Sequence, residues 1–226
     1  MKIIEPSFEI LTPFGSLSEQ VGIQMLQFIE KMARISHRSE ERQTEDSWRR
    51  FIQAVVLEHG DWSVVEHAAL TVVFRVDRGV THELVRHRLF SFTQESTRFV
   101  NYAKKTDLEF IEPAELKSGE GGSSSRFLWT NSIGESERTY LDLLRNGIRP
   151  QEARSVLPNA LAATIAVTGN LRNFRHFLLM RTSKETHPDF RRVTDPLLME
   201  FKMFIPLLFD DIEAGQRQIE NMRKPR

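Results

Sequence analysis

The sequence predicts a mixed fold of helices and strands, of the α+β class. Its length fits one domain or two small ones, and we expect a single domain over residues 1–226. Two strands are indicated most clearly: apolar residues alternate in AALTVVFRV at 68–76, and small and branched residues fill ALAATIAVTG at 160–169. Other stretches, such as 127–145, carry apolar residues at helical spacing. With 40% apolar residues, a chain of 226 residues can bury a sizeable core.

The amino-terminal quarter is predicted to hold one short strand and two helices. Residues 1–14 are apolar but cut by two prolines, which favours a single short strand. Ser16 and Glu19 form the pattern of a capping box and predict a helix with four apolar residues on one face: Val21, Met25, Phe28 and Met32. Thr44 is expected to cap the second helix, whose buried face would carry Trp48, Phe51, Ile52 and Val55.

The densest cluster of groups that can bind phosphate or a heterocycle lies at Arg86-His87-Arg88, Ser96 and Arg98. THELVRHRLF at 81–90 is predicted to be a helix. On a helix, Arg86, His87 and Arg88 would point about 100° apart, so they would contact different groups. If QESTRFVNY at 94–102 is extended, Ser96 and Arg98 share a face that suits a phosphorylated substrate. On chemistry alone, such a cluster is more often a solvated surface, or a helix C-terminus whose dipole is neutralised by the cations.

The next part of the chain is predicted to form a strand, a loop and a long helix. LEFIEP at 108–113 is expected to be the strand, and LKSGEGGSSS at 116–125 a mobile surface loop. The helix over 127–145 would end at Gly147, and Pro150 would begin another. The expected core face of the long helix carries Leu128, Ile133, Tyr140, Leu141 and Leu144.

The last third is predicted to be mainly helical after the strand at 160–169. Asn170 is expected to cap a helix on which three apolar residues pack, while Arg172 and His176 share a polar face and Arg181 lies one turn further. The packing residues are Leu171, Phe174 and Leu178. Arg154, in EARSVLP, is predicted to be partly buried and to need an anion. From residue 187 the chain is helical in pattern and apolar enough to complete the core or to meet a second chain.

Charge and composition exclude several classes of protein. Thirty-one basic and thirty-one acidic residues cancel, so no global field attracts nucleic acid or an anionic membrane. Residues 145–192 nevertheless hold nine Lys or Arg against three acids, which suits a small anionic ligand. The absence of cysteine excludes disulfides and favours a reducing compartment. With no apolar stretch of about 18 residues and no signal-like amino terminus, we expect a cytoplasmic protein without membrane contact.

Two stretches rich in histidine are not interpreted as metal sites. His59, Asp61 and His67 match no ligand spacing that would hold zinc. In HELVRH at 82–87 the histidines are five residues apart, whereas a zinc-binding helix needs them four apart. We therefore expect no metal.

Arg86-His87-Arg88, followed after seven residues by Ser96, resembles the signature of the flavin-dependent thymidylate synthases, and RHRLFSFTQESTRFVNY is similar to that family beyond the bare pattern. PQEARSVLP, around Arg154, and the capped helix from Asn170 to Arg181 are two further similar pieces. The resemblance covers roughly residues 16–195. It implies mixed helices with an antiparallel sheet, assembled as a homotetramer with active sites at subunit interfaces. The lack of cysteine agrees, because the other class of thymidylate synthase attacks the uracil ring with a thiolate.

The same resemblance implies the reaction. dUMP would be reductively methylated to dTMP, with methylene-tetrahydrofolate as carbon donor and FAD, reduced by NADPH, as hydride carrier. FAD would be held without a Rossmann fold, which agrees with the absence of a glycine fingerprint.

The resemblance also implies which residues form the site. The expected dUMP contacts are Glu83, Arg86, Gln94, Glu95, Ser96, Thr97, Arg98, Arg154 and Arg181. The expected FAD contacts are Ser63, Arg86, His87, Arg88, Gln94, Asn170, Arg172 and His176. Arg181 would be the catalytic residue, stabilising negative charge on the activated uracil, and Arg98 and Arg154 would take the phosphate. Glu83 is expected near the base or paired with an arginine, and Ser36 is either loop surface or a flavin neighbour.

Three alternatives remain open. A nucleic-acid-binding module could use the same arginines, a non-catalytic helical scaffold could use the apolar carboxyl end, and another flavoenzyme could share the fold. Overall neutrality and the placement of the arginines argue against the first two.

Overall fold

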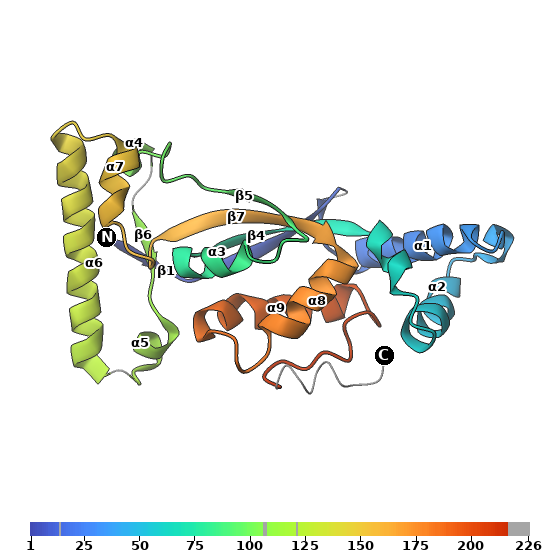
Figure 1. Ribbon diagram of the computed structural model, residues 1–226. Helices are drawn as coiled ribbons and strands as arrows, with labels where there is room; N and C mark the ends of the chain where they lie inside the picture. The colour runs from blue at the N-terminus through green and yellow to red at the C-terminus, as the bar shows by residue number, and fades with distance from the viewer. Residues whose placement is uncertain (14, 106–107, 121, 217–226) are drawn as a thin grey trace. The chain divides into compact units, whose positions relative to one another are not determined.

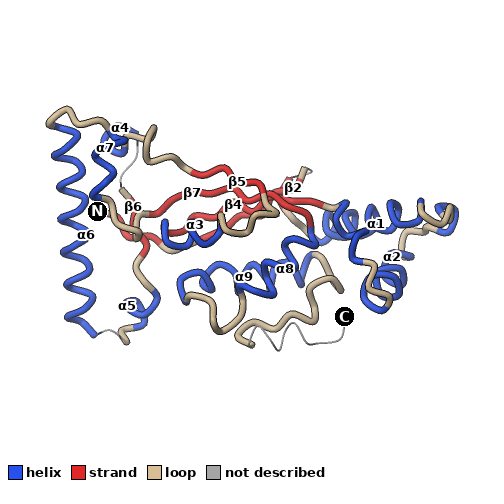
Figure 2. The backbone as a smooth tube through the Cα atoms, viewed as in Figure 1, coloured by secondary structure: helices blue, strands red, loops and turns tan. Residues whose placement is uncertain are grey.

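The computed structural model describes residues 1–13, 15–105, 108–120 and 122–216, and it shows helices interspersed with strands along the whole chain (Figures 1 and 2). The strands are β1 (Lys2–Ile4), β2 (Ser7–Thr12), β3 (Gly15–Ser16), β4 (Ala69–Asp77), β5 (Ser91–Gln94), β6 (Glu109–Ile111) and β7 (Ala162–Asn170). The helices are α1 (Glu19–Ile35), α2 (Ser47–Phe51), α3 (Arg78–Leu84), α4 (Tyr102–Lys105), α5 (Ala114–Ser118), α6 (Gly122–Arg145), α7 (Pro150–Ala153), α8 (Leu171–Arg181) and α9 (Pro188–Phe204). Short 3-10 helices span Glu40–Arg42, Trp62–His67 and Arg154–Val156, and a π-helix spans Ile52–Glu58.

The strands form two sheets. Five of them follow the order β3-β2-β4-β7-β5, with β2 and β3 antiparallel, and β1 pairs with β6 in parallel. The prediction of mixed helices with an antiparallel sheet is confirmed at this level, with the short parallel pair as an addition. No helix of the described residues is long and apolar enough to cross a membrane.

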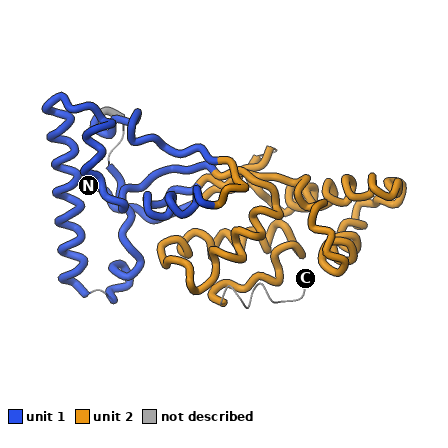
Figure 3. The backbone as a smooth tube through the Cα atoms, viewed as in Figure 1, with its two compact units in different colours: residues 1–7, 74–86, 92–166 blue, residues 8–73, 87–91, 167–226 orange. Residues whose placement is uncertain are grey.

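The chain divides into two compact units (Figure 3). Unit 1 comprises residues 1–7, 74–86 and 92–166, and unit 2 comprises residues 8–73, 87–91 and 167–226. The division falls inside β2, β4, β5 and β7, so each of these strands contributes residues to both units. The prediction of a single domain over 1–226 stays a prediction.

The core of unit 1 forms where α6 packs against α7 and the β6 region (Figure 1). Phe110 and Leu161 are fully buried and face each other in an isolated antiparallel bridge. Tyr140 of α6 is also fully buried, and its ring lies 6.1 Å from that of Tyr102, nearly edge to face. Burying two such aromatic residues is worth about 2–3 kcal/mol each, which anchors α6 to the rest of the unit.

The core of unit 2 is built mainly from phenylalanines of α8 and α9. Phe174 contacts Phe90 at 4.8 Å and Phe201 at 5.5 Å between ring centroids, and Phe177 contacts Phe190 at 5.9 Å. All five rings are at most 9% exposed. The apolar carboxyl end of the sequence therefore completes a core within this chain.

The amino-terminal predictions need three corrections. Residues 1–12 form two strands, not one, because Pro6 offers no N–H and lies where the chain passes from β1 to β2. Ser18, not Ser16, caps α1: its hydroxyl accepts from the N–H of Val21 at 3.4 Å, while Ser16 belongs to β3. The buried stripe accordingly falls on Met25, Leu26 and Ile29, and Phe28 is 46% exposed.

The second helix also begins differently from the prediction. Asp46 occupies the N-cap of α2, and Thr44 instead donates its N–H to the Ser47 hydroxyl at 2.9 Å. After Phe51 the chain continues as the π-helix, which has more residues per turn than an α-helix. Trp48, Ile52 and Val56 are therefore buried, whereas Val55 is only half-buried.

The predicted mobile loop at 116–125 is largely helical in the described residues. α5 extends to Ser118, and Gly119 ends it with φ = 84°, a left-handed conformation that costs glycine little. α6 already begins at Gly122, so the stretch that was predicted to be a loop contains the first turn of the long helix. Leu128, expected in the core, is 68% exposed, while Ile133 and Tyr140 are buried as predicted.

Several predictions are confirmed. Leu70, Val72, Phe74 and Val76 alternate inward along β4, each at most 2% exposed. β7 covers most of ALAATIAVTG, Pro150 stands in the first turn of α7, and α6 ends shortly before Gly147, which has φ = 83°. Asn170 caps α8 by accepting from the N–H of Asn173 at 2.9 Å.

Candidate active site

The motif Arg86-His87-Arg88 lies after a helix, not on one. α3 ends at Leu84, and the chain then turns, with the N–H of Arg86 donating to the carbonyl of Glu83 at 3.3 Å. The predicted helix over 81–90 is therefore wrong at its carboxyl end. The reason is tertiary: Phe90 must reach the aromatic core of unit 2, where its ring meets Phe174. Arg86 and Arg88 are exposed, and neither forms an ion pair with any residue that the structure describes.

Within unit 2, the motif histidine meets the arginine at the end of α8. Arg181 Nε donates to His87 Nε2 at 2.8 Å, across 94 residues of sequence. The Arg181 guanidinium also lies over the ring of Phe190, 5.1 Å from the ring centroid. The backbone carbonyl of Arg181 accepts from the Thr194 hydroxyl at 2.7 Å. Because Nε2 accepts, His87 is the neutral tautomer with its proton on Nδ1. The pair fixes the direction of the Arg181 guanidinium.

The remaining unit 2 residues lie along α8 and the short helix at 62–67. Arg172 Nη1 donates to Glu66 Oε1 at 2.5 Å, so α8 and this short helix are joined by an exposed ion pair. Ser63 and His176 are exposed, and Asn170 is engaged in capping α8. Asn173 Nδ2 donates to the carbonyl of Leu89 at 3.0 Å, which ties α8 to the segment that follows the motif.

In unit 1, Ser96 and Arg98 lie in a turn and not on an extended strand. β5 ends at Gln94, and the carbonyl of Ser96 accepts from the N–H groups of Phe99 at 3.2 Å and Val100 at 3.0 Å. The Ser96 hydroxyl accepts from the N–H of Arg98 at 3.3 Å. The prediction of an extended segment over 94–102 is therefore wrong, because Ser96 turns the chain with both its carbonyl and its hydroxyl.

Two side-chain hydrogen bonds connect the end of β5 and this turn to α3 and to the short helix after α7. Gln94 Nε2 donates to the Thr81 hydroxyl at 2.9 Å, and Arg154 Nη1 donates to the Thr97 hydroxyl at 3.2 Å. Arg154 is exposed, not partly buried as predicted, and its Nε donates to the Gln151 carbonyl at 3.1 Å. Neither Arg98 nor Arg154 pairs with a carboxylate in the part of the chain that the structure describes. Both therefore keep an uncompensated positive charge beside the turn.

Glu95, another of the predicted site residues, accepts three hydrogen bonds. Its carboxylate accepts from Arg75, from Tyr102 and from the backbone N–H of Thr164. Sequence reasoning missed Arg75 and Tyr102, although Arg75 was recognisable as the charged residue on the polar face of a strand. Burial, followed by the hydrogen bond to Glu95, raises the pKa of the Tyr102 hydroxyl well above its ordinary value.

The pKa of Tyr102 predicts how stability changes in alkali. A raised pKa in the folded state means that the bound proton stabilises the fold below about pH 10 and that this contribution is lost as pH rises above that value. We expect the unfolding free energy of the wild type to fall above pH 10 by up to about 1.4 kcal/mol per pH unit for this group. Tyr102→Phe should flatten that decline, measured by urea unfolding at pH 8 and pH 11. An equally steep decline in Tyr102→Phe would contradict the assignment.

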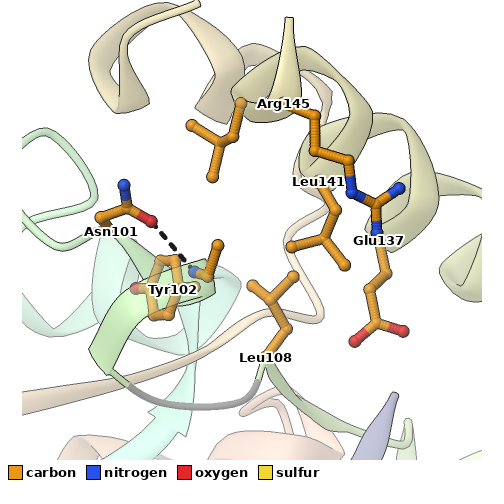
Figure 4. Close-up of a pocket in the computed structure, with 8 residues that line it drawn as sticks. Asn101, Tyr102, Leu108, Glu137, Leu141 and Arg145 are labelled. Atoms are coloured by element: carbon orange, nitrogen blue, oxygen red, sulfur yellow. Dashed lines mark hydrogen bonds between the residues drawn. The ribbon is translucent and has the colours of Figure 1, made fainter. Parts of the chain in front are cut away.

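A cavity of about 470 Å³ opens elsewhere in unit 1 (Figure 4). Leu108, Leu141 and Leu144 form its apolar wall, and Tyr102, Glu137 and Arg145 face it from α4 and α6. None of the predicted dUMP or FAD contacts lines it. No group of three or more His, Asp or Glu side chains that could hold a metal ion occurs among the residues described.

Comparison with known proteins adds a family to this geometry. Residues 23–207 match the family model described as "Thymidylate synthase complementing protein". The chain is 38% identical over 169 residues to a flavin-dependent thymidylate synthase of Corynebacterium efficiens and 35% identical over 178 residues to one of Mycobacterium sp. (strain JLS), in each case over 70% of this chain and 68% of the relative. A crystal structure of the UMP/dUMP methylase PolB from Streptomyces cacaoi, bound with 5-Br dUMP, has a similar fold. Its TM-score is 0.74 at 22% identity, covering 93% of this chain and 96% of that one.

Proposed function

The chain belongs to the family of thymidylate synthase complementing proteins, whose relatives are flavin-dependent thymidylate synthases, and we propose that it is the enzyme that methylates dUMP to dTMP. Methylene-tetrahydrofolate would donate the carbon, and NADPH would reduce the flavin, which is FAD. The proposal includes a homotetramer with active sites at the subunit interfaces and a single functional domain over residues 1–226. Without a cysteine, the chain has no thiolate to attack the uracil ring, so its own residues must act by binding and electrostatics.

The residues proposed to hold FAD fit a dinucleotide in charge and chemistry. Arg86 and Arg88 are exposed cations without an acidic partner among the described residues, which suits a diphosphate. The other proposed FAD contacts add hydroxyl, amide, imidazole and guanidinium groups: Ser63, His87, Gln94, Asn170, Arg172 and His176. When bound, FAD supplies the hydride chemistry that side chains cannot.

The residues proposed to hold dUMP divide between phosphate and base. The turn after β5 carries Ser96, Thr97 and Arg98, and Arg154 reaches it through its hydrogen bond to Thr97. Together these residues offer two uncompensated guanidinium groups and two hydroxyls to a phosphate. Arg181 would lie against the uracil and stabilise negative charge as the ring is activated. Glu83, Arg86, Gln94 and Glu95 complete the proposed set, and Glu83 stands in the last turn of α3.

The observation that carries the proposal is the hydrogen bond between Arg181 and His87. It joins His87, which the resemblance assigns to the flavin, to Arg181, which lies 94 residues later and which the resemblance assigns to the uracil. A guanidinium held by a neutral imidazole on one side and by an aromatic ring on another is directed before substrate arrives. Such preorganisation is what electrostatic stabilisation of a developing anion needs.

The visible spectrum of the purified, FAD-supplemented protein tests the proposal, before and after addition of dUMP. We expect a bound flavin spectrum that shifts with dUMP, together with dTMP formation when methylene-tetrahydrofolate and NADPH are supplied. A protein that remains colourless under these conditions would contradict the proposal. Nucleic acid carried through purification, with binding that falls steeply with salt, would favour the nucleic-acid-binding alternative.

Replacing Arg154 with alanine tests the phosphate contact. The KM for dUMP should rise about 10- to 100-fold, because a charge-assisted hydrogen bond to phosphate is lost. Binding of deoxyuridine, which has no phosphate, should change by less than about twofold. Arg138→Ala is the matched control, since Arg138 is exposed and paired with Glu135 on α6. Equal losses for dUMP and deoxyuridine in Arg154→Ala would show that Arg154 does not bind the phosphate.

A further inference from the structure

Glu95 links the end of β5 to the turn that carries Ser96, Thr97 and Arg98, and both of its carboxylate oxygens are hydrogen-bonded within unit 1. Oε1 accepts from the Tyr102 hydroxyl at 2.7 Å. Oε2 accepts from Arg75 Nη1 at 2.7 Å and from the N–H of Thr164 at 3.2 Å. Three donors from β4, β7 and α4 thus point at this one carboxylate.

Arg75 compensates the charge of Glu95 and connects it to a second carboxylate. Its Nη1 also donates to the Thr164 hydroxyl at 2.9 Å, and its Nη2 donates to Glu109 Oε2 at 2.8 Å. Lys2 donates to the other oxygen of Glu109 at 2.5 Å. Two cations and two carboxylates therefore balance, so the network brings no net negative charge to a phosphate bound nearby.

The bond between Glu95 and Tyr102 closes a loop over residues 95–102, which we call the 95–102 loop. Inside it, the Ser96 carbonyl accepts two backbone N–H groups, and Thr97 is only 5% exposed. At its far end the Tyr102 ring packs against Tyr140, and Tyr102 is also only 5% exposed. The loop is therefore fixed at both ends, and the residues between them include three of the proposed phosphate ligands, Ser96, Thr97 and Arg98.

We propose that Glu95 is a positioning residue, which together with Arg75 and Tyr102 holds the 95–102 loop in the shape that presents Ser96, Thr97 and Arg98 to the nucleotide. This inference rests on the proposed function, and it replaces the assignment of Glu95 as a direct dUMP contact. A carboxylate already engaged by three donors has little capacity left for substrate, and a free carboxylate in this place would repel the phosphate.

A double-mutant cycle with Glu95→Ala and Tyr102→Phe tests the inference. Each single substitution should raise the KM and the Kd for dUMP roughly tenfold and change kcat by less than about threefold, because the loop is loosened while the groups at the base remain. The double variant should bind dUMP no more weakly than the single variant with the higher Kd, since both substitutions break the same contact. Multiplicative effects on dUMP binding would overturn the inference, because they would mean that Glu95 acts on the nucleotide without Tyr102.

Two further variants separate positioning from general damage. Tyr140→Phe removes a buried phenolic hydroxyl from the neighbouring ring without touching Glu95, and it should leave the KM within about twofold of the wild type. Glu95→Gln keeps one oxygen for the Arg75 and Thr164 donors and an amide that can pair with Tyr102, so it should restore most of the binding that Glu95→Ala loses. A Glu95→Gln variant as weak as Glu95→Ala would contradict the positioning role.

Hydrogen exchange of the free protein separates this inference from the proposed function. In Tyr102→Phe, the amides of residues 96–101 should exchange at least about tenfold faster than in the wild type, with no nucleotide present. Unchanged exchange would overturn the inference even if the wild type binds dUMP. Failure of the wild type to bind dUMP would instead overturn the proposed function, and the exchange result would still decide whether the 95–102 loop is held by Glu95.

Discussion

Replacing Arg181 with alanine is expected to lower the rate of dTMP formation by about two to three orders of magnitude. The guanidinium is held by His87 Nε2 at 2.8 Å and by the face of Phe190, so it is directed before substrate binds. Removing a preorganised charge from a developing anion has effects of this size. The rate is measured as dTMP formed at saturating dUMP, so that weakened binding does not contribute to the loss.

The control for Arg181 is a substitution that keeps charge but loses geometry. Arg181→Lys retains a cation, yet an ammonium on a flexible stem cannot reproduce the planar contact with Phe190 while donating to His87. We expect it to recover less than about a tenth of the wild-type rate. Full activity in Arg181→Ala, with normal folding by circular dichroism, would remove Arg181 from the proposed mechanism.

Replacing Gly22 with alanine is expected to destabilise the protein by about 3 kcal/mol or more, the largest stability effect that we predict. Gly22 lies on the buried face of α1, where a Cβ would come within 1.7 Å of the Phe204 carbonyl oxygen at the end of α9. The clash is with backbone, so no rotamer change can relieve it and the helices must separate. The free energy of unfolding by urea measures the loss.

Gly134→Ala is the matched control for this prediction. Gly134 lies inside α6, and a Cβ there meets nothing within 4 Å. The same substitution should therefore stabilise the protein by about 0.5–1 kcal/mol, because alanine loses less backbone entropy than glycine in a helix. A destabilisation of similar size in both variants would show that close packing of α1 and α9 is not the cause.

Features that depend on neighbouring residues were predictable from the sequence. The alternation along β4 and the Asn170 cap of α8 follow from local patterns, and both are confirmed. The first helix was also predicted, but its cap was misplaced by two residues because Ser16, with Glu19 three residues later, completes the capping-box pattern, whereas the structure places Ser16 in β3 and caps the helix with Ser18.

Features that depend on distant residues were not predictable in this way. The helix over 81–90 ends early because Phe90 packs on Phe174, and the turn at Ser96 is supported by donors from Arg75 and Thr164. Spacing along the chain carries no information about such partners. For the same reason, family resemblance placed Glu95 beside the nucleotide but could not identify the groups that already occupy its carboxylate.

The contacts of the 95–102 loop have a consequence for the order of folding. Thr164 donates its N–H to Glu95, which lies 69 residues earlier, and its hydroxyl accepts from Arg75, which lies 89 residues earlier. Pairings across such separations form slowly, since loop closure must precede them. During synthesis, the turn after β5 thus stays unfinished until β7 has left the ribosome, and β5 itself has no partner strand before then, because β7 is its neighbour in the sheet.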